Sequence, residues 1–167
     1  ILAKDLRVMS IKKHIPNIVT LGNLFCGTLA TIFAVGGHFE MTALFVALGI
    51  FLDFFDGFFA RIFNVSGELG RQLDSLADMV TSGVVPGIVL FVLLESNQQA
   101  SYEINTEFKI SMGLPLIGLL VTLAACYRLA KFNLDTRQSE SFIGLPTPAM
   151  SLFIVSLPLV QMHSDIN

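Results

Sequence analysis

Charged residues are scarce in this sequence. Lys, Arg, Asp and Glu make up 14% of the 167 residues, whereas a soluble domain normally contains about 25%, and this argues against a water-soluble globular domain. Disorder is excluded, because it requires low hydrophobicity and 53% of these residues are hydrophobic. The net charge of −3 provides no basic surface, so we expect no nucleic-acid partner.

Cysteine is rare as well, and its two positions lie in different apolar blocks. Neither Cys26 nor Cys126 has a second cysteine at the spacing of a metal or redox site, so both are interpreted as packing residues. The histidines also lack the spacing of metal ligands. No repeat, heptad run or low-complexity segment divides the chain, and we therefore expect a single domain over residues 1–167.

The sequence is rich in long apolar blocks. Three of them carry no charge and have the roughly 20 residues that a membrane-spanning helix needs, and two more are apolar except for a few acids and bases. The first block is too long for the apolar core of a signal peptide and is expected to remain as a helix. The sequence thus predicts an all-α, polytopic membrane helical bundle with five spans, at about 15–35, 40–63, 70–94, 110–130 and 146–162.

The basic residues predict the orientation of these spans. With five alternating spans, nine of the ten Lys and Arg residues fall on one side, and such residues collect on the cytoplasmic side of a membrane. We therefore expect a cytoplasmic N-terminus. Residues 1–14 mix apolar and basic side chains and predict a short amphipathic helix at the membrane interface; a plain basic flank of the first span is the alternative.

Four aspartates interrupt the second and third spans near their cytoplasmic ends. Ionisable residues inside a membrane are costly and usually functional. At α-helical spacing each span presents its acids together with small residues on one face, and small residues favour close packing of the two helices as antiparallel neighbours. The two faces are Asp53, Asp56, Gly57 and Ala60 on one helix, and Gly70, Asp74, Asp78 and Ser82 on the next.

This acidic cluster predicts a metal site. Four carboxylates at one depth in a low dielectric would repel one another or take up protons, and divalent cations would remove that problem. Carboxylate oxygens suit Mg²⁺ or Mn²⁺. The structural alternative is a set of ion pairs with Arg61 and Arg71, but two bases cannot neutralise four acids.

Eight residues at fixed spacing carry a family resemblance. The pattern DxxDGxxAR, followed after eight residues by GxxxDxxxD, is similar to the signature of the CDP-alcohol phosphatidyltransferases, and the resemblance extends over nearly the whole chain. The eight residues are Asp53, Asp56, Gly57, Ala60, Arg61, Gly70, Asp74 and Asp78. The family usually has six or more spans, whereas five are visible here; either a last helix is absent or the sequence is a piece of a longer protein.

The resemblance implies a metal-dependent reaction at the cell membrane. In this family a phosphatidyl group passes from CDP-diacylglycerol to a small alcohol and CMP leaves, and the proteins are usually homodimers. Two further stretches, 15–23 and 128–133 followed by 142–149, resemble the branch whose acceptor is L-serine; branches that use glycerol 3-phosphate or inositol phosphate are the alternatives. By analogy two Mg²⁺ or Mn²⁺ ions would be held by Asp53, Asp56, Asp74 and Asp78, and Asp78 would also be the general base.

The resemblance also implies where the substrates bind. The nucleotide of CDP is assigned to Asp56, Gly57, Ala60, Arg61 and Gly70, together with a polar stripe in the first span that consists of Asn17, Thr20 and Asn23. Capping of the first span is the alternative for this stripe, most of all for Asn17. The acceptor or a lipid phosphate is assigned to Arg128, Lys131 and Asn133; a basic flank of the fourth span explains Arg128 and Lys131 equally well.

Two other classes of membrane protein also keep acids within their spans. A cation-coupled transporter would do so, but the inverted repeats or broken helices expected of one are not visible in the sequence. A prenyltransferase related to the UbiA group uses membrane aspartates on a diphosphate, but with a different spacing and on separated helices. The enzyme interpretation is therefore preferred.

Overall fold

The computed structural model describes residues 2–62, 67–101, 113–134 and 145–164, with side chains for 15–62, 67–96, 114–134 and 145–163. The described part is helical and contains no strand. Its elements are α1 (Leu2–Val35), α2 (Phe39–Ile62), α3 (Glu68–Asp78), the π-helix η1 (Met79–Val84), α4 (Val85–Ser101), α5 (Gly113–Leu134) and α6 (Thr147–Ser164).

Four helical stretches are long and apolar enough to cross a membrane, and these are Ile15–Val35, Phe39–Ile62, Glu68–Ser96 and Leu114–Leu134. A shorter apolar helix covers Thr147–His163. Residues 63 and 110–112 of the predicted spans lie outside the described residues. The predicted all-α polytopic membrane bundle is confirmed, with apolar helices where the sequence placed its spans.

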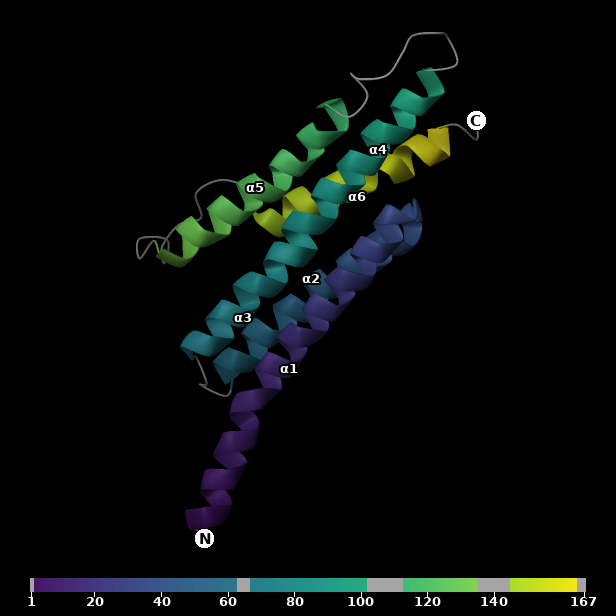
Figure 1. Cartoon of the computed structure of the whole chain (residues 1–167). Helices are drawn as coiled ribbons and strands as arrows, with labels where there is room; N and C mark the ends of the chain where they lie inside the picture. The colour runs from purple at the N-terminus through teal and green to yellow at the C-terminus, as the bar shows by residue number, and fades with distance from the viewer. Residues whose placement is uncertain (1, 63–66, 102–112, 135–144, 165–167) are drawn as a thin grey trace.

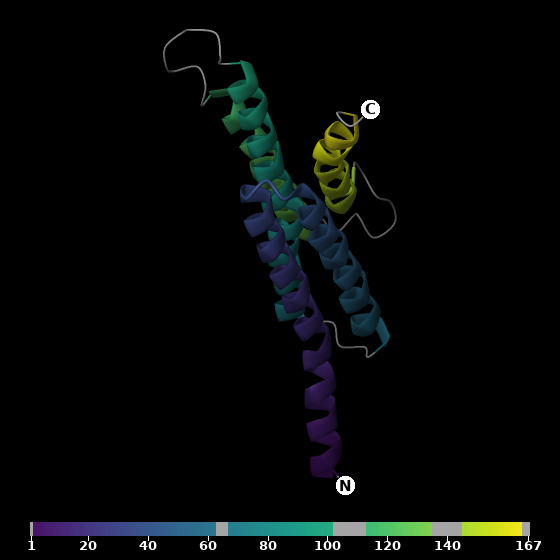
Figure 2. The ribbon, with the colours of Figure 1, turned by 90° about the vertical axis from the view of Figure 1, so that its right-hand side faces the viewer.

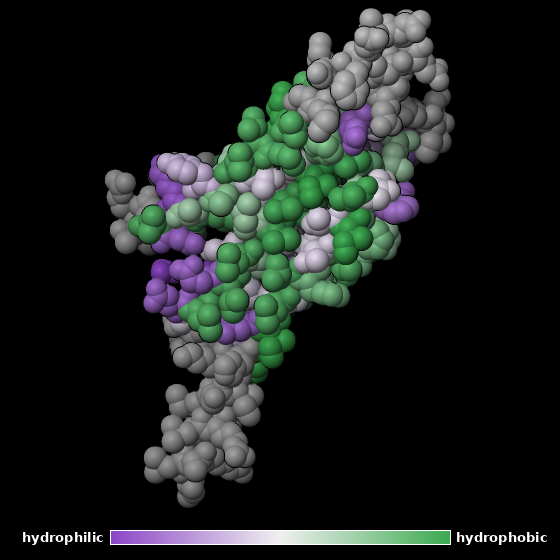
Figure 3. Space-filling model, in the orientation of Figure 1, coloured by the Kyte–Doolittle hydropathy of each residue, from purple (hydrophilic) through white to green (hydrophobic). Residues whose placement is uncertain are grey.

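Small side chains fill the interior of the bundle and large apolar ones cover its surface. Ala30, Ala34 and Val46 are fully buried, whereas Phe54 and Leu123 are 68% and 65% exposed. A band of hydrophobic residues covers the face drawn in Figure 3, and hydrophilic residues gather mainly near its left edge. This arrangement suits a protein whose surrounding solvent is lipid, because small residues let membrane helices approach one another closely.

The first two spans form an antiparallel hairpin through a short glycine turn (Figures 1 and 2). Gly37 adopts a positive φ of 72°, which glycine allows without strain. The N–H of Gly37 donates to the carbonyl of Ala34, and the N–H of His38 donates to that of Phe33 at 2.9 Å. This is the Schellman pattern that ends a helix, and α2 begins directly after His38.

Helix α1 is continuous from Leu2 to Val35 and carries Pro16 in its interior. The predicted segment 1–14 is thus helical from Leu2 on, but it continues directly into the first span. In Figure 1 the N-terminal part of α1 extends beyond the other helices. The placement of this segment on a membrane surface stays a prediction.

The third span contains a π-helical turn at its centre. α3, η1 and α4 follow one another without a break, and η1 packs against every α-helix of the bundle. The prediction of one face from Gly70 to Ser82 assumed an unbroken α-helix, whereas a wider π turn begins directly after Asp78 and shifts the residues that follow it around the helix axis. Ser82 is fully buried.

Candidate metal centre

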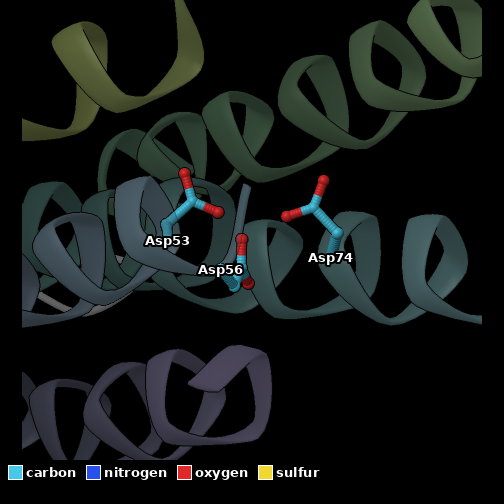
Figure 4. A group of neighbouring side chains, drawn as sticks. All are labelled: Asp53, Asp56 and Asp74. Carbon is cyan, nitrogen blue, oxygen red and sulfur yellow. The ribbon is translucent and has the colours of Figure 1, made fainter. Parts of the chain in front are cut away.

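Three carboxylates converge between α2 and α3. Asp53 and Asp56 come from α2 and Asp74 from α3, and one oxygen of each lies within 4.8 Å of the others. Figure 4 shows the carboxylates of Asp53 and Asp74 turned toward each other, with Asp56 between them. Asp56 is only 6% exposed, and the other two side chains are half-buried.

The two helices that carry the acids are supported chiefly by a third. Contrary to the expected direct packing of the second span on the third, α2 and the N-terminal part of the third span each pack mainly against α1. The carboxylates then meet across the space between α2 and α3. A physical reason is that negatively charged groups on both helices need room for a counter-ion, which close helix contact would not leave.

The described surroundings of these acids contain no compensating base. The charged groups that act on Asp53, Asp56 and Asp78 within the described chain are other aspartates, and both Arg61 and Arg71 are exposed. The ion-pair alternative is thus not the arrangement of the described residues. A set of oxygen donors that carries net negative charge fits a hard divalent cation.

Asp78 lies one helical turn beyond Asp74 and outside the group of three. Its side chain is half-buried. The carboxylates of Asp53, Asp56 and Asp74 and the amide of Asn23 are its neighbours. It is close enough to act on a molecule bound at the cluster without belonging to the compact set. Its predicted roles as fourth metal ligand and as base both stay predictions.

Thr20 of α1 forms a hydrogen bond with one of the three carboxylates. Its side chain is buried, and its hydroxyl donates to Oδ2 of Asp56 while the carbonyl of Pro16 lies 3.0 Å away. A hydroxyl has one proton to donate, and the shorter contact is the one to Asp56. Hydrogen bonds of this kind orient carboxylates that bind metals.

We expect Thr20→Val to weaken Mn²⁺ binding by about tenfold, because loss of a partner that orients a metal ligand typically costs 10–100-fold in affinity. The measurement is a titration of the purified protein with Mn²⁺, followed by electron paramagnetic resonance. Thr20→Ser should bind like the wild type. Thr28→Val is the matched control, since the hydroxyl of Thr28 donates to the carbonyl of Leu24 in its own helix. Equal affinity of Thr20→Val and wild type would contradict the role of this hydroxyl.

Other residues assigned to the nucleotide lie near the C-terminal end of α2 and the N-terminal end of α3. Asn17 and Gly70 are brought together, since a Cβ on Gly70 would lie 3.3 Å from Oδ1 of Asn17. Gly57 is exposed, and a Cβ there would meet nothing within 4 Å, so the space beside Gly57 is open. Ala60 is half-buried and Arg61 exposed. Nucleotide binding by these residues stays a prediction.

The capping interpretation of the polar stripe is wrong. Asn17, Thr20 and Asn23 lie in the middle of α1, which begins at Leu2, so none of them occupies a helix terminus. Asn23 is fully buried, and its Oδ1 accepts a hydrogen bond of 2.8 Å from the hydroxyl of Thr81. It therefore has a partner within the protein before any nucleotide binds.

The residues assigned to the acceptor lie at the C-terminal end of α5. Arg128 is half-buried and Lys131 is exposed. The amide nitrogen of Asn133 donates to the hydroxyl of Ser75 over 2.8 Å, and Ser75 lies between Asp74 and Asp78 in α3. Asn133 thus ties the end of α5 to the helix that carries two of the aspartates. Binding of an acceptor by these residues stays a prediction.

Sequence reasoning missed four hydroxyl residues that hold the helices together near the site. Each donates or accepts a hydrogen bond between helices. Each is also a polar residue inside an apolar span or between two acids, and this position in the sequence is the signal that could have identified it. They are Ser75, Thr81, Thr122 and Ser151.

Comparison with known proteins identifies relatives over most of the chain. The family model described as CDP-alcohol phosphatidyltransferase matches residues 13–164. A CDP-diacylglycerol-serine O-phosphatidyltransferase of Bacillus subtilis is 37% identical over 148 residues, which cover 86% of this chain and 75% of that protein. The protein of the same name from Helicobacter pylori strain J99 is 32% identical over 148 residues, 87% of this chain and 57% of that one.

An archaeal relative is more distant. The archaetidylserine synthase of Methanothermobacter thermautotrophicus is 27% identical over 157 residues, which cover 92% of this chain and 61% of that protein. The chain thus spans little more than half the length of the Helicobacter and archaeal relatives. No solved structure matches it.

Proposed function

Because the chain belongs to the CDP-alcohol phosphatidyltransferase family, we propose that it transfers the phosphatidyl group of CDP-diacylglycerol to the hydroxyl of L-serine, with phosphatidylserine and CMP as products. The observation that carries this proposal is the group of three carboxylates within 4.8 Å of one another, which lies within the eight-residue signature. Serine as the acceptor is supported by the names of the Bacillus and Helicobacter relatives.

The carboxylates suit the binding of a lipid diphosphate through metal ions. Asp53, Asp56 and Asp74 would hold Mg²⁺ or Mn²⁺, with Asp78 completing a site for two ions. Bound ions of this kind neutralise the diphosphate and stabilise the charge that develops on the attacking and leaving oxygens. The hydrogen bond from Thr20 to Asp56 keeps one of these ligands in a fixed orientation.

The transfer itself needs a base near the acceptor. The serine hydroxyl oxygen forms a bond to the lipid-bearing phosphorus, the bond from this phosphorus to the oxygen of CMP breaks, and CMP leaves with the electron pair. Asp78 takes the proton of the hydroxyl, since it lies next to the cluster but outside the compact group of three. General bases of this type contribute about 10²- to 10⁴-fold to a rate.

The remaining polar residues near the site are assigned to substrate recognition. The nucleotide would lie against the open side of α2 at Gly57, next to Ala60 and Arg61, and against Gly70. Asn17, Thr20 and Asn23 would line its α1 side. The carboxylate of serine or the lipid phosphate would meet Arg128 and Lys131, while Asn133 holds this end of α5 against α3.

We place the protein in the cell membrane as a homodimer, with the carboxylate cluster and the N-terminus near the cytoplasmic face. The distribution of Lys and Arg supports this orientation, and the large apolar residues on the bundle surface support full immersion in lipid. Residues 2–14, which are helical, would lie along the cytoplasmic surface of the membrane.

An acceptor competition assay tests the function. Purified protein in mixed micelles with CDP-diacylglycerol and Mn²⁺ receives radiolabelled L-serine, with or without unlabelled glycerol 3-phosphate or inositol phosphate. We expect label in the chloroform-soluble lipid only when CDP-diacylglycerol and the metal are both present, and no competition by the other alcohols. Preferential use of another alcohol would overturn the choice of serine, and no lipid product from any of the three would overturn the enzyme proposal.

A further inference from the structure

The π-helix η1 directly follows the helix that carries Asp78. It begins at the residue after Asp78 and packs against every α-helix. Thr81, Ser82 and Gly83 of this turn are all buried. Single π turns within α-helices occur frequently at functional sites, and this one begins one residue after an aspartate of the predicted site.

Hydroxyl groups from two other helices fix the backbone of η1. Ser151 of α6 donates to the carbonyl of Thr81 over 3.2 Å, and Thr122 of α5 donates to the carbonyl of Gly83 over 3.0 Å. Buried carbonyl groups need such partners, because an unpaired one costs roughly 1–3 kcal/mol. The two helices therefore stabilise η1 in the geometry that the structure shows.

The side chain of Thr81 lies in a space that two glycines leave open. A Cβ on Gly27 of α1 would lie 3.1 Å from the backbone nitrogen of Thr81, and one on Gly49 of α2 would lie 2.9 Å from Oδ1 of Asn23 and 3.0 Å from Cγ2 of Thr81. These distances are shorter than ordinary van der Waals contacts, so any larger residue would displace Thr81 or Asn23. The pair is thus enclosed by α1, α2 and η1.

In the side-chain amide of Asn23, the oxygen has a hydrogen-bond partner and the nitrogen has none among the described residues. Its Oδ1 accepts from the hydroxyl of Thr81 at 2.8 Å, and its buried Nδ2 has no hydrogen-bond partner among the described residues. The amide lies beside the carboxylate of Asp78. An ionised carboxylate only accepts hydrogen bonds, so the donor end of the amide is the one that suits Asp78.

We propose that Thr81 and Asn23 are positioning residues for Asp78, in which the Thr81 hydroxyl holds the Asn23 amide with its Nδ2 toward the Asp78 carboxylate. This role rests on the proposed function, where Asp78 receives the acceptor's proton. Without the hydroxyl the amide can rotate and offer its oxygen instead, which would repel the carboxylate. Thr81 lies in the π turn, three residues after Asp78, and its hydroxyl reaches Asn23 of α1.

Kinetics of two substitutions at Thr81 test this role. Thr81→Val removes the hydroxyl and keeps the shape; we expect kcat to fall by about 10- to 100-fold, since misplacing a reacting group by ~1 Å costs on the order of 100-fold. KM for serine should change by less than about twofold, because Thr81 is fully buried and its hydroxyl bonds to Asn23, a residue that is assigned to the nucleotide and not to the acceptor. Thr81→Ser keeps the hydroxyl and should retain the wild-type kcat.

The matched control is Thr31→Val, which removes a hydroxyl that donates to the carbonyl of Gly27 within α1 and should leave both constants unchanged. Two results would overturn the positioning role. One is an unchanged kcat in Thr81→Val. The other is an equal loss in Thr81→Ser and Thr81→Val, which would assign the effect to packing.

A measurement that does not need turnover separates this inference from the proposed function. In protein labelled with ¹⁵N-asparagine, the side-chain NH₂ signal of Asn23 is identified by its loss in Asn23→Ser. We expect this signal to shift in Thr81→Val and in Asp78→Asn, and to stay in place in Thr81→Ser. If the signal shifts in neither Thr81→Val nor Asp78→Asn, the contact of the Asn23 amide with Thr81 and Asp78 is overturned. If the signal responds but the wild type makes no lipid from serine, the proposed function fails and the contact stands.

Discussion

Asp78→Asn should lower turnover by about 1000-fold, within the 10²- to 10⁴-fold that a general base contributes, while it weakens Mn²⁺ binding less than Asp74→Asn does. The amide has nearly the same shape as the carboxylate but cannot take a proton at neutral pH. The asymmetry between turnover and binding follows from the position of Asp78 outside the compact group of three. Single-turnover formation of labelled lipid measures the first quantity, and paramagnetic resonance of Mn²⁺ the second.

Two comparisons make this prediction decisive. Glu68→Gln removes an exposed acid from the first turn of the same helix and should leave turnover unchanged. Full turnover in Asp78→Asn would refute the assignment of the base. A loss of Mn²⁺ affinity in Asp78→Asn as large as that in Asp74→Asn would instead identify Asp78 as a metal ligand of equal weight.

Asp74→Asn should strongly reduce both activity and metal affinity. It removes the contribution of α3 to the three-carboxylate group, so we expect Mn²⁺ affinity to fall by more than the roughly 10- to 100-fold that follows when a supporting residue is lost. The same substitution should raise the thermal midpoint measured in EDTA, because it removes one of several negative charges that repel one another when no cation is bound. Excess Mn²⁺ should restore only part of the activity.

The two readouts of Asp74→Asn have opposite signs, and this distinguishes a metal site from a structural cluster. A structural cluster held by hydrogen bonds would lose stability in EDTA when Asp74 is replaced. A lower thermal midpoint in EDTA together with unchanged Mn²⁺ affinity would therefore contradict the metal centre. Asp5→Asn, which lies outside the apolar spans in the first turns of α1, provides a charge-matched control.

The spans and the carboxylate cluster were predictable because both depend on local spacing. An apolar block of the right length predicts a membrane helix, and acids three or four residues apart share a helix face. These two rules, and the assumption that consecutive spans lie near each other, were enough to predict that Asp53, Asp56 and Asp74 converge. The structure brings those three side chains together as expected.

The parts that sequence reasoning missed depend on contacts between distant residues. Thr81 and its partner Asn23 are 58 residues apart, and nothing in the pattern around either residue names the other. The π turn leaves no trace in hydropathy, because Thr81, Ser82 and Gly83 suit an α-helix in lipid as well as a π-helix. The support of both acidic helices by α1 likewise arises from how three helices pack.

The length of α1 has a consequence for how the molecule sits in a bilayer. Its 34 residues correspond to a rod of about 51 Å at ~1.5 Å per residue, whereas the hydrocarbon interior of a bilayer is about 30 Å thick. The helix is thus roughly 20 Å longer than this layer, so it must tilt, bend, or project out of the hydrocarbon region. The weakest point for bending is Pro16, where a backbone hydrogen bond is missing, and it is one turn from Thr20. Lipid thickness and the orientation of Asp56 are therefore linked through one continuous helix.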